Sequence, residues 1–219
     1  MFCCARQGVG VRLNIQKAMN PVDIIKKYYN PDSKTFEILL QHSRSVTKMA
    51  VHIASSIKGL NPNIDFIKEA AMLHDIGIFM TNATSLGCHG KYPYICHGYL
   101  GRELLEEAGL PKHALVCERH VGVGITINDI KRQKLPLPLR NMEPISIEEK
   151  IICYADKFFN KSKQYEDKQK TIEEIEQGLN LFGHNNVIKF RLLTKLFKEN
   201  GFHLFPDCLS QTPYPVHST

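Results

Sequence analysis

Several polar residues that can bind a metal ion occur where an expected helix would face the protein core. Steps of three and four residues mark one face of a helix, and on this count His42 shares its face with Leu39, Val46 and Ile53. Three further polar residues fall on the apolar faces of three other expected helices: His74, His120 and Asp156. The pattern therefore predicts that polar side chains from four helices point into the interior.

A divalent cation is the partner that these side chains favour. Burying an ionised carboxylate without a partner costs several kcal/mol, and the pattern would bury both Asp75 and Asp156 among imidazoles. Mixed nitrogen and oxygen ligands favour Fe, Mn, Co, Ni or Zn over Ca²⁺. A single histidine is more often a hydrogen-bonded core residue than a ligand. We expect five other histidines at the surface or in the tail: His52, His113, His184, His203 and His217.

The adjacent pair His74-Asp75 constrains where the ion can lie. Neighbouring residues on a helix point about 100° apart. Both can therefore reach one ion only if it lies beyond the helix surface, with His42 and Asp156 completing the site from other helices. Ile76-Gly77 follows directly and brings this helix close to its end.

Helical patterns that could position these residues dominate the chain. Asn20 and Ser33 are candidate caps for the first two helices, and Ser146 with Glu149 forms a capping-box pattern before the helix that carries Asp156. A loop or lid is expected over residues 122–144, which hold two glycines and three prolines. The expected helices are a short one from Pro21, then 34–57, 64–79, 94–108, 111–121, one from 147, 172–182 and 187–198.

The whole chain is typical of one domain. Its 219 residues suffice for a sizeable core, and no apolar run predicts a membrane span. A net charge of +6 is too small and scattered to indicate nucleic-acid binding, but it suits an anionic substrate. Seven cysteines without a CxxC pair favour a reducing cytoplasm. We expect a dispensable extension over 1–19, the folded domain over 20–200 and a peripheral tail over 201–219, in a monomer or homodimer.

The motifs around these residues resemble the HD superfamily of metal-dependent phosphohydrolases. His42 lies in LLQHSRSV, His74-Asp75 in AAMLHDIG and Asp156 in IICYADKF, in the order of that superfamily. The resemblance covers roughly residues 20–196 and implies an all-α HD-domain bundle. It also implies that these four residues bind one metal ion and that Asp75 can bridge to a second.

Two further histidines extend the resemblance to the subset of HD proteins with two metals. His97 in ICHGYLGRELL and His120 in VCERHVGVG would bind the second ion, as in HD-GYP phosphodiesterases and bacterial symmetrical dinucleoside-tetraphosphate hydrolases. A structural role on a tight helix-packing face is the alternative for His97, and the ligand role is favoured. The chain has no GYP motif, and its segment 79–94 is longer than expected for the dinucleotide hydrolases. The substrate therefore does not follow from the resemblance.

The reaction that the resemblance implies is hydrolysis of a phosphate ester or anhydride, of a nucleotide or dinucleotide, by a metal-activated water. Asp75 would orient that water, while Lys157 and Arg119 would stabilise negative charge. Each of these cations is also compatible with a structural or solvated role. Four residues are candidates to contact a small phosphorylated substrate: Arg44, His89, Lys91 and Tyr92.

Two other kinds of function are compatible with the same residues. A metal-binding or nucleotide-binding sensor would keep the pocket without turnover, although the complete ligand set favours an enzyme. An oxygenase is a further alternative, because a few diiron HD relatives use O₂.

Overall fold

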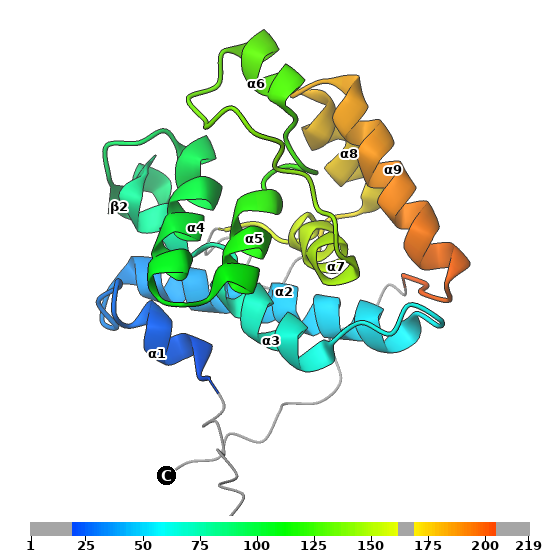
Figure 1. Cartoon of the computed structure of the whole chain (residues 1–219), viewed down its shortest axis with the longest axis horizontal. Helices are drawn as coiled ribbons and strands as arrows, with labels where there is room; N and C mark the ends of the chain where they lie inside the picture. Colours follow the sequence, from blue (N-terminus) through cyan, green and yellow to red (C-terminus); the bar gives the residue numbers. More distant parts are fainter. Residues whose placement is uncertain (1–18, 162–168, 205–219) are drawn as a thin grey trace, which may run out of the picture.

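One long helix, α2 (Lys34–Ser56), crosses the lower part of the molecule and packs against α3 and α7 (Figure 1). The computed structural model describes residues 19–161 and 169–204. Over these residues the chain is almost entirely helical, so the predicted all-α class is confirmed. The helices other than α2 are α1 (Pro21–Ile25), α3 (Ile64–Leu73), α4 (His97–Glu107), α5 (Pro111–Arg119), α6 (Ile127–Gln133), α7 (Ile147–Asp156), α8 (Ile172–Asn180) and α9 (His184–Glu199).

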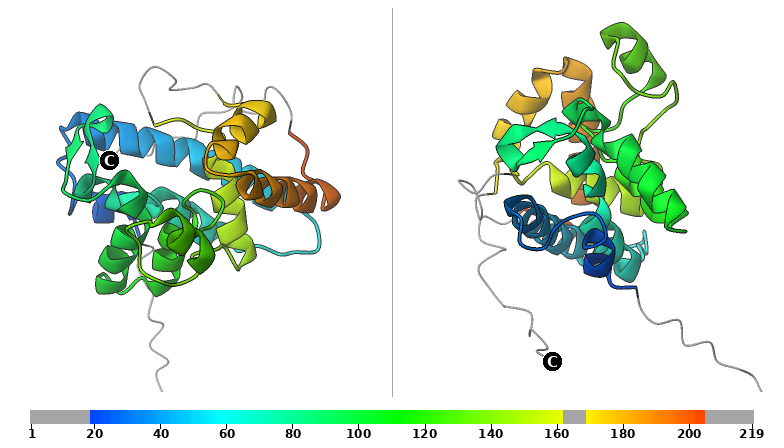
Figure 2. Two further views of the ribbon diagram at one scale, coloured as in Figure 1. Left: turned by 90° about the horizontal axis from the view of Figure 1, so that it is seen from above. Right: turned by 90° about the vertical axis from the view of Figure 1, so that its left-hand side faces the viewer.

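Short elements fill the segment between α3 and α4. The strands β1 (Asn82–Ala83) and β2 (Cys88–His89) form a two-residue antiparallel pair (Figure 2). The 3-10 turns η1 (Ile76–Met80) and η3 (Tyr94–Cys96) precede and follow this pair, and the turn η2 (Thr84–Leu86) connects its strands. Among the described residues, no helix is long and apolar enough to cross a membrane.

Two predicted helix starts are wrong, because α4 begins at His97 rather than at residue 94 and α9 begins at His184 rather than at residue 187. The three predicted caps agree with the structure, with one correction. The side chains of Asn20, Ser33 and Ser146 each accept a hydrogen bond from the first turn of the helix that follows. The capping box predicted at Ser146 is half formed, however. The carboxylate of Glu149 accepts a hydrogen bond from the backbone N–H of Ile145 and pairs with Arg119, so it does not reach back to Ser146.

Two apolar clusters meet along α2. The first half of the helix packs with α1, η1 and the inner faces of α4 and α5. The second half packs with α3, α7, α8 and α9. Leu40 belongs to the first of these clusters and Val46 to the other. His42 lies between them, so the fold brings polar side chains together where the two apolar regions adjoin.

The segment 122–144, expected as a loop or lid, contains a helix, α6, that was not predicted. Thr126 and Asp129 form a complete capping box at the start of that helix. Ile125 and Met142 pair as an isolated bridge, and both belong to a small apolar cluster with Ile130. The Thr126–Asp129 spacing is typical of a helix start, but the glycines and prolines of the segment favoured the prediction of a loop.

Salt bridges hold this segment against the helices. Glu118 on α5 is buried, and its carboxylate pairs with Arg102 on α4 and Arg140 of the segment. Lys189 on α9 pairs with Glu143 and donates a hydrogen bond to the carbonyl of Gly124. Of the domain boundaries expected from the sequence, residues 1–18 and 205–219 lie outside the described residues.

Replacing Glu118 with alanine is expected to lower the free energy of unfolding by about 1–3 kcal/mol, because it leaves two arginines without their buried partner. Glu106 is the matched control, since it also pairs with Arg102 but is exposed, and Glu106→Ala should cost less than about 1 kcal/mol. Urea denaturation followed by circular dichroism measures both. Equal losses in the two variants would contradict the structural role given to Glu118.

Candidate metal centre

The chain bends at His74 and Asp75, where the sequence predicts a continuous helix over residues 64–79. The α-helix ends at Leu73, and His74 is its last residue in helical conformation. Asp75 has φ −107° and ψ 10°, in the sparsely populated region between helix and strand, and η1 follows. The helical expectation is therefore wrong from Asp75 onward. The bend allows both side chains to point into the same buried space.

Close packing of two glycines brings α4 to this bend. A Cβ atom at Gly77 would lie 2.3 Å from the carbonyl oxygen of His97, and one at Gly101 would lie 2.3 Å from Sγ of Cys117. Any larger residue at either position would push η1, α4 and α5 apart. The glycines therefore allow His97 and His120, which lie at the start of α4 and the end of α5, to reach Asp75.

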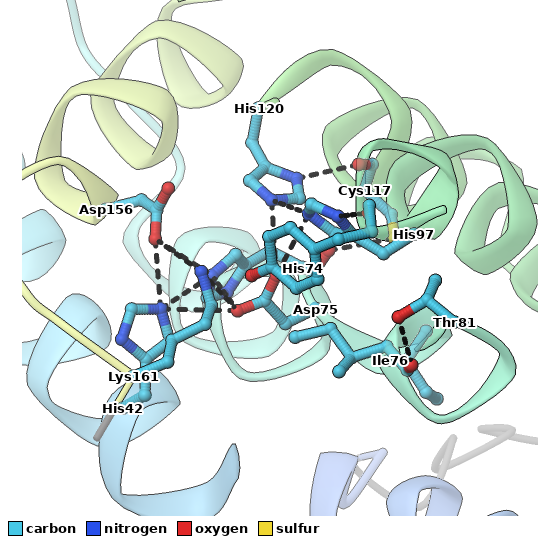
Figure 3. Close-up of polar contacts among 12 residues, drawn as sticks. His42, His74, Asp75, Ile76, Thr81, His97, Cys117, His120, Asp156 and Lys161 are labelled. Carbon is cyan, nitrogen blue, oxygen red and sulfur yellow. Dashed lines mark hydrogen bonds and ion pairs between the residues drawn. The ribbon is translucent and has the colours of Figure 1, made fainter. Parts of the chain in front are cut away.

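The first group of potential ligands consists of His42, His74, Asp75 and Asp156, and all four are buried (Figure 3). Nε2 of His42 lies 2.9 Å from Oδ1 of Asp156 and 3.3 Å from Oδ2 of Asp75. Nε2 of His74 lies 3.1 Å from the same Asp75 oxygen. Four ligand atoms from α2, the α3 bend and α7 thus surround one point.

The second group consists of Asp75, His97 and His120. The two Nε2 atoms lie 3.1 Å apart, and Oδ1 of Asp75 is 3.4 Å from His97 and 3.3 Å from His120. Asp75 therefore belongs to both groups and presents a different oxygen to each. Neither oxygen accepts a hydrogen bond of good geometry from the described residues.

Backbone carbonyls fix the orientation of three imidazoles. Nδ1 of His74, His97 and His120 lies 2.6 to 2.7 Å from the carbonyl oxygen three residues earlier in the chain. Because a carbonyl only accepts, each Nδ1 carries the proton and donates it. In the neutral form of each ring, Nε2 then presents its lone pair to the cluster, which is the arrangement that metal-binding histidines use.

Electrostatics in the cluster favour ionised carboxylates. Burial raises the pKa of Asp75, but His74 and Lys161 outweigh this effect and hold it well below its usual range. For Asp156, Lys157 and Lys161 likewise overcome burial and lower the pKa. Burial lowers the pKa of His97 to about 3. The carboxylates therefore carry negative charge while His97 stays neutral.

The pKa of His74 is raised, whereas that of His97 is lowered. Burial alone lowers the pKa of an imidazole, but the carboxylates of Asp75 and Asp156 raise that of His74 to about 9. The two buried negative charges thus attract positive charge into the space that they share.

The donor set fits divalent cations. Metal–ligand bonds of about 2.0–2.2 Å place neighbouring ligand atoms about 3–3.5 Å apart, and the nitrogen and oxygen atoms of the two groups have about this spacing. Lone pairs of facing imidazoles repel each other unless a proton or a cation lies between them. The buried carboxylate of Asp75 supplies negative charge to both groups. The buried cluster can therefore hold metal, and its mixed donors suit transition-metal ions.

The other predicted site residues lie at different distances from this cluster. Nζ of Lys157 is 2.6 Å from Oδ2 of Asp156 and donates to the carbonyl of His120. Arg119 instead forms a two-oxygen salt bridge with Glu149. Arg44 is exposed on the outer side of α2, where it lines a surface groove with Glu37.

Three predicted substrate contacts lie on the segment between α3 and α4. His89 is exposed in β2, opposite Asn82. Lys91 is exposed, and its ammonium lies 5.2 Å from the centre of the Tyr92 ring. Among the described residues, no hydrogen bond or ion pair joins any of the three to the buried cluster, so their role in substrate binding stays a prediction.

Sequence reasoning missed two residues beside the cluster. Nζ of Lys161 lies 3.0 Å from Oδ2 of Asp75 and 3.5 Å from Oδ1 of Asp156. The ring centroids of Tyr94 and His97 lie 4.7 Å apart, and burial raises the pKa of the Tyr94 hydroxyl while Lys161 lowers it. Lys161 lies beyond the end of α7, so a helical face count does not reach it. Tyr94 could have been predicted beside the cluster, because residues three apart share a helix face and Tyr94 is three residues before His97.

One surface assignment is also wrong. His113 is buried on α5 and pairs with Glu69 at 3.2 Å. His52 is partly buried against Phe202, whereas His184 and His203 are exposed as expected. His217 lies outside the described residues.

Comparison with known proteins decides the family. A family model described as the HD domain matches residues 39–161, which is more than half of the chain. The chain belongs to the HD-domain family. The match begins just before His42 and ends at Lys161, so the HD domain contains both ligand groups. The predicted resemblance to this family of metal-dependent phosphohydrolases is confirmed.

Individual relatives add limited information. An uncharacterized protein of Methanocaldococcus jannaschii is 35% identical over 133 residues, which are 59% of this chain and 71% of that protein. A Thermoplasma volcanium protein named tRNA (cytidine(56)-2'-O)-methyltransferase is 30% identical over 159 residues, covering 72% of this chain and 41% of that protein. The Picrophilus torridus protein of the same name is 32% identical over 121 residues, covering 55% and 31%. The chain thus spans less than half of either methyltransferase-named relative. No solved structure matches it.

The two ligand groups lead us to expect two bound ions per chain. His97→Ala and His120→Ala should each bind one ion per chain, because they remove a nitrogen from the second group only. Inductively coupled plasma mass spectrometry after dialysis against Mn²⁺ measures the number of Mn²⁺ ions bound per chain. His113→Ala is the matched control, since this buried histidine on α5 pairs with Glu69 outside both groups. Two ions retained in His97→Ala would contradict the second site.

Proposed function

We propose that this HD domain hydrolyses a phosphate ester or anhydride of a nucleotide or dinucleotide. The observation that carries the proposal is the pair of buried ligand groups that share Asp75. His42, His74, Asp75 and Asp156 would hold one ion. Asp75, His97 and His120 would hold a second. Fe, Mn, Co, Ni and Zn all suit this donor set.

Bound divalent ions would lower the pKa of a water molecule towards about 7 and polarise a phosphoryl oxygen. The protein contributes orientation and charge. Asp75 presents one oxygen to each group, so it is placed to orient a water molecule between them and to accept its proton. The carbonyl hydrogen bonds of the imidazoles keep their lone pairs directed at the cluster.

Positive charge for the phosphoryl group comes from two lysines in this proposal. Lys157 and Lys161 lie beside Asp156, and their side chains are largely buried. Arg119 is next to His120 in the sequence, but its guanidinium is engaged by Glu149. We therefore assign stabilisation of the substrate's negative charge to Lys157 and Lys161 rather than to Arg119.

The nucleotide part of the proposal rests on the family resemblance and on the cationic side chains near the centre. The name of the two methyltransferase-named relatives describes proteins of which this chain matches less than half, so methyl transfer is not part of the proposal. A sensor without turnover remains the alternative, and it would use the same ligands.

Purified protein loaded with Mn²⁺, Fe²⁺, Co²⁺ or Ni²⁺ should hydrolyse at least one member of a panel of generic phosphodiesters, phosphomonoesters, nucleotides and dinucleoside polyphosphates. Asp75→Asn should lower kcat/KM at least about 100-fold, because loss of an outer-shell partner alone costs 10–100-fold. His52→Ala on α2 is the control and should retain activity. Phosphate release and chromatography of the products measure turnover.

Two results would contradict the proposal in different ways. Bound metal without turnover of any substrate by any of the four loaded forms would favour the sensor. Full activity in Asp75→Asn would show that the reaction occurs elsewhere in the molecule.

A further inference from the structure

Lys161 is the lysine whose ammonium contacts the carboxylate oxygens that face the first ligand group. Its ammonium lies 3.0 Å from Oδ2 of Asp75 and 3.5 Å from Oδ1 of Asp156 (Figure 3). These are the same two oxygens that Nε2 of His42 approaches. A metal ion held by this group would bind those oxygens, so the ammonium and the ion need the same negative charges.

Lys157 does not compete in this way. Its ammonium contacts the other oxygen of Asp156, Oδ2, and also donates to the carbonyl of His120. That oxygen takes no part in the contacts with His42 and His74. Of the two lysines, Lys161 is therefore the one whose contacts a metal ion would replace.

The charge balance makes the competition costly. The two carboxylates of the first group already face two ammonium groups, so their negative charges are balanced without an ion. A divalent ion adds two positive charges at close range to Lys161, in a region with little water to screen them. Either the ammonium withdraws from the carboxylates or an anion joins the site. The side chain of Lys161 is 17% exposed, so it borders solvent.

We propose that Lys161 couples metal binding to anion binding in the first group. The ammonium competes with the ion for Asp75 and Asp156, and a phosphate bound beside the ion accepts the ammonium that the ion displaces. Metal and phosphate then bind more tightly together than alone. Linkage requires the effect to be reciprocal: phosphate raises metal affinity by the same factor as metal raises phosphate affinity. This inference rests on the proposed metal site.

The test is calorimetric titration of the full chain with Mn²⁺, with and without inorganic phosphate. Phosphate should tighten Mn²⁺ binding to the wild type about 5- to 150-fold, the usual range for coupled sites. Lys161→Met should bind Mn²⁺ alone about tenfold more tightly than the wild type, because its internal competitor is gone. It should also lose most of the phosphate effect.

Two further variants separate the specific role of Lys161 from general effects. Lys189→Met removes one positive charge from a lysine of similar exposure that pairs with Glu143, far from the ligand groups in the sequence. It should titrate like the wild type. Lys161→Arg keeps the positive charge. It should bind Mn²⁺ alone more weakly than Lys161→Met does, and phosphate should still tighten its Mn²⁺ binding. Circular dichroism checks that each variant is folded.

Unchanged or weaker Mn²⁺ binding in folded Lys161→Met, or an undiminished phosphate effect, would overturn the inference and leave the metal site standing. If Lys161→Met does not fold, the same comparison is made with Lys161→Gln. Absence of Mn²⁺ binding to the wild type would overturn the proposed metal centre itself, and the coupling with it.

Discussion

A buried carboxylate that accepts no good hydrogen bond is the constraint on which the rest of this structure depends. Asp75 is fully buried, and its oxygens lie 3.0 to 3.4 Å from four imidazole nitrogens and one ammonium. An isolated charge in such a place would cost several kcal/mol. The surrounding elements are arranged to supply positive charge or neutral lone pairs, and all of them except α2 contribute through an end or a bend. The chemistry of the site follows from that arrangement.

The packing of the fold can be understood as the means of meeting this constraint. Two apolar clusters adjoin along α2, and the polar residues lie at the boundary between them. Gly77 and Gly101 let η1, α4 and α5 approach until backbone atoms nearly touch. A site assembled from helix ends is also close to backbone carbonyls. Those carbonyls accept hydrogen bonds from the Nδ1–H groups and so orient the imidazoles.

The sequence predicted the parts of the site that follow from helical periodicity and from the HD motif. His42 and Asp156 share faces with apolar residues, so their burial could be anticipated, and the caps at Asn20 and Ser33 defined two helix starts. The bend at Asp75 could not be seen, because no proline or glycine precedes it. Lys161 lies beyond a helix end, where no period applies. His113 was misjudged because its partner, Glu69, is 44 positions away.

Residues beyond the family match complete the support of the centre. The match ends at Lys161, yet α8 and α9 close the apolar cluster around α7. The ring of Tyr154, two residues before Asp156, stacks on Phe190 at 5.0 Å and meets Phe197 edge-on at 5.1 Å. Because these aromatic contacts fix the last turn of α7, they also fix Asp156 relative to α2. The HD motif thus supplies the ligands, while the C-terminal helices determine how rigidly one of them is held.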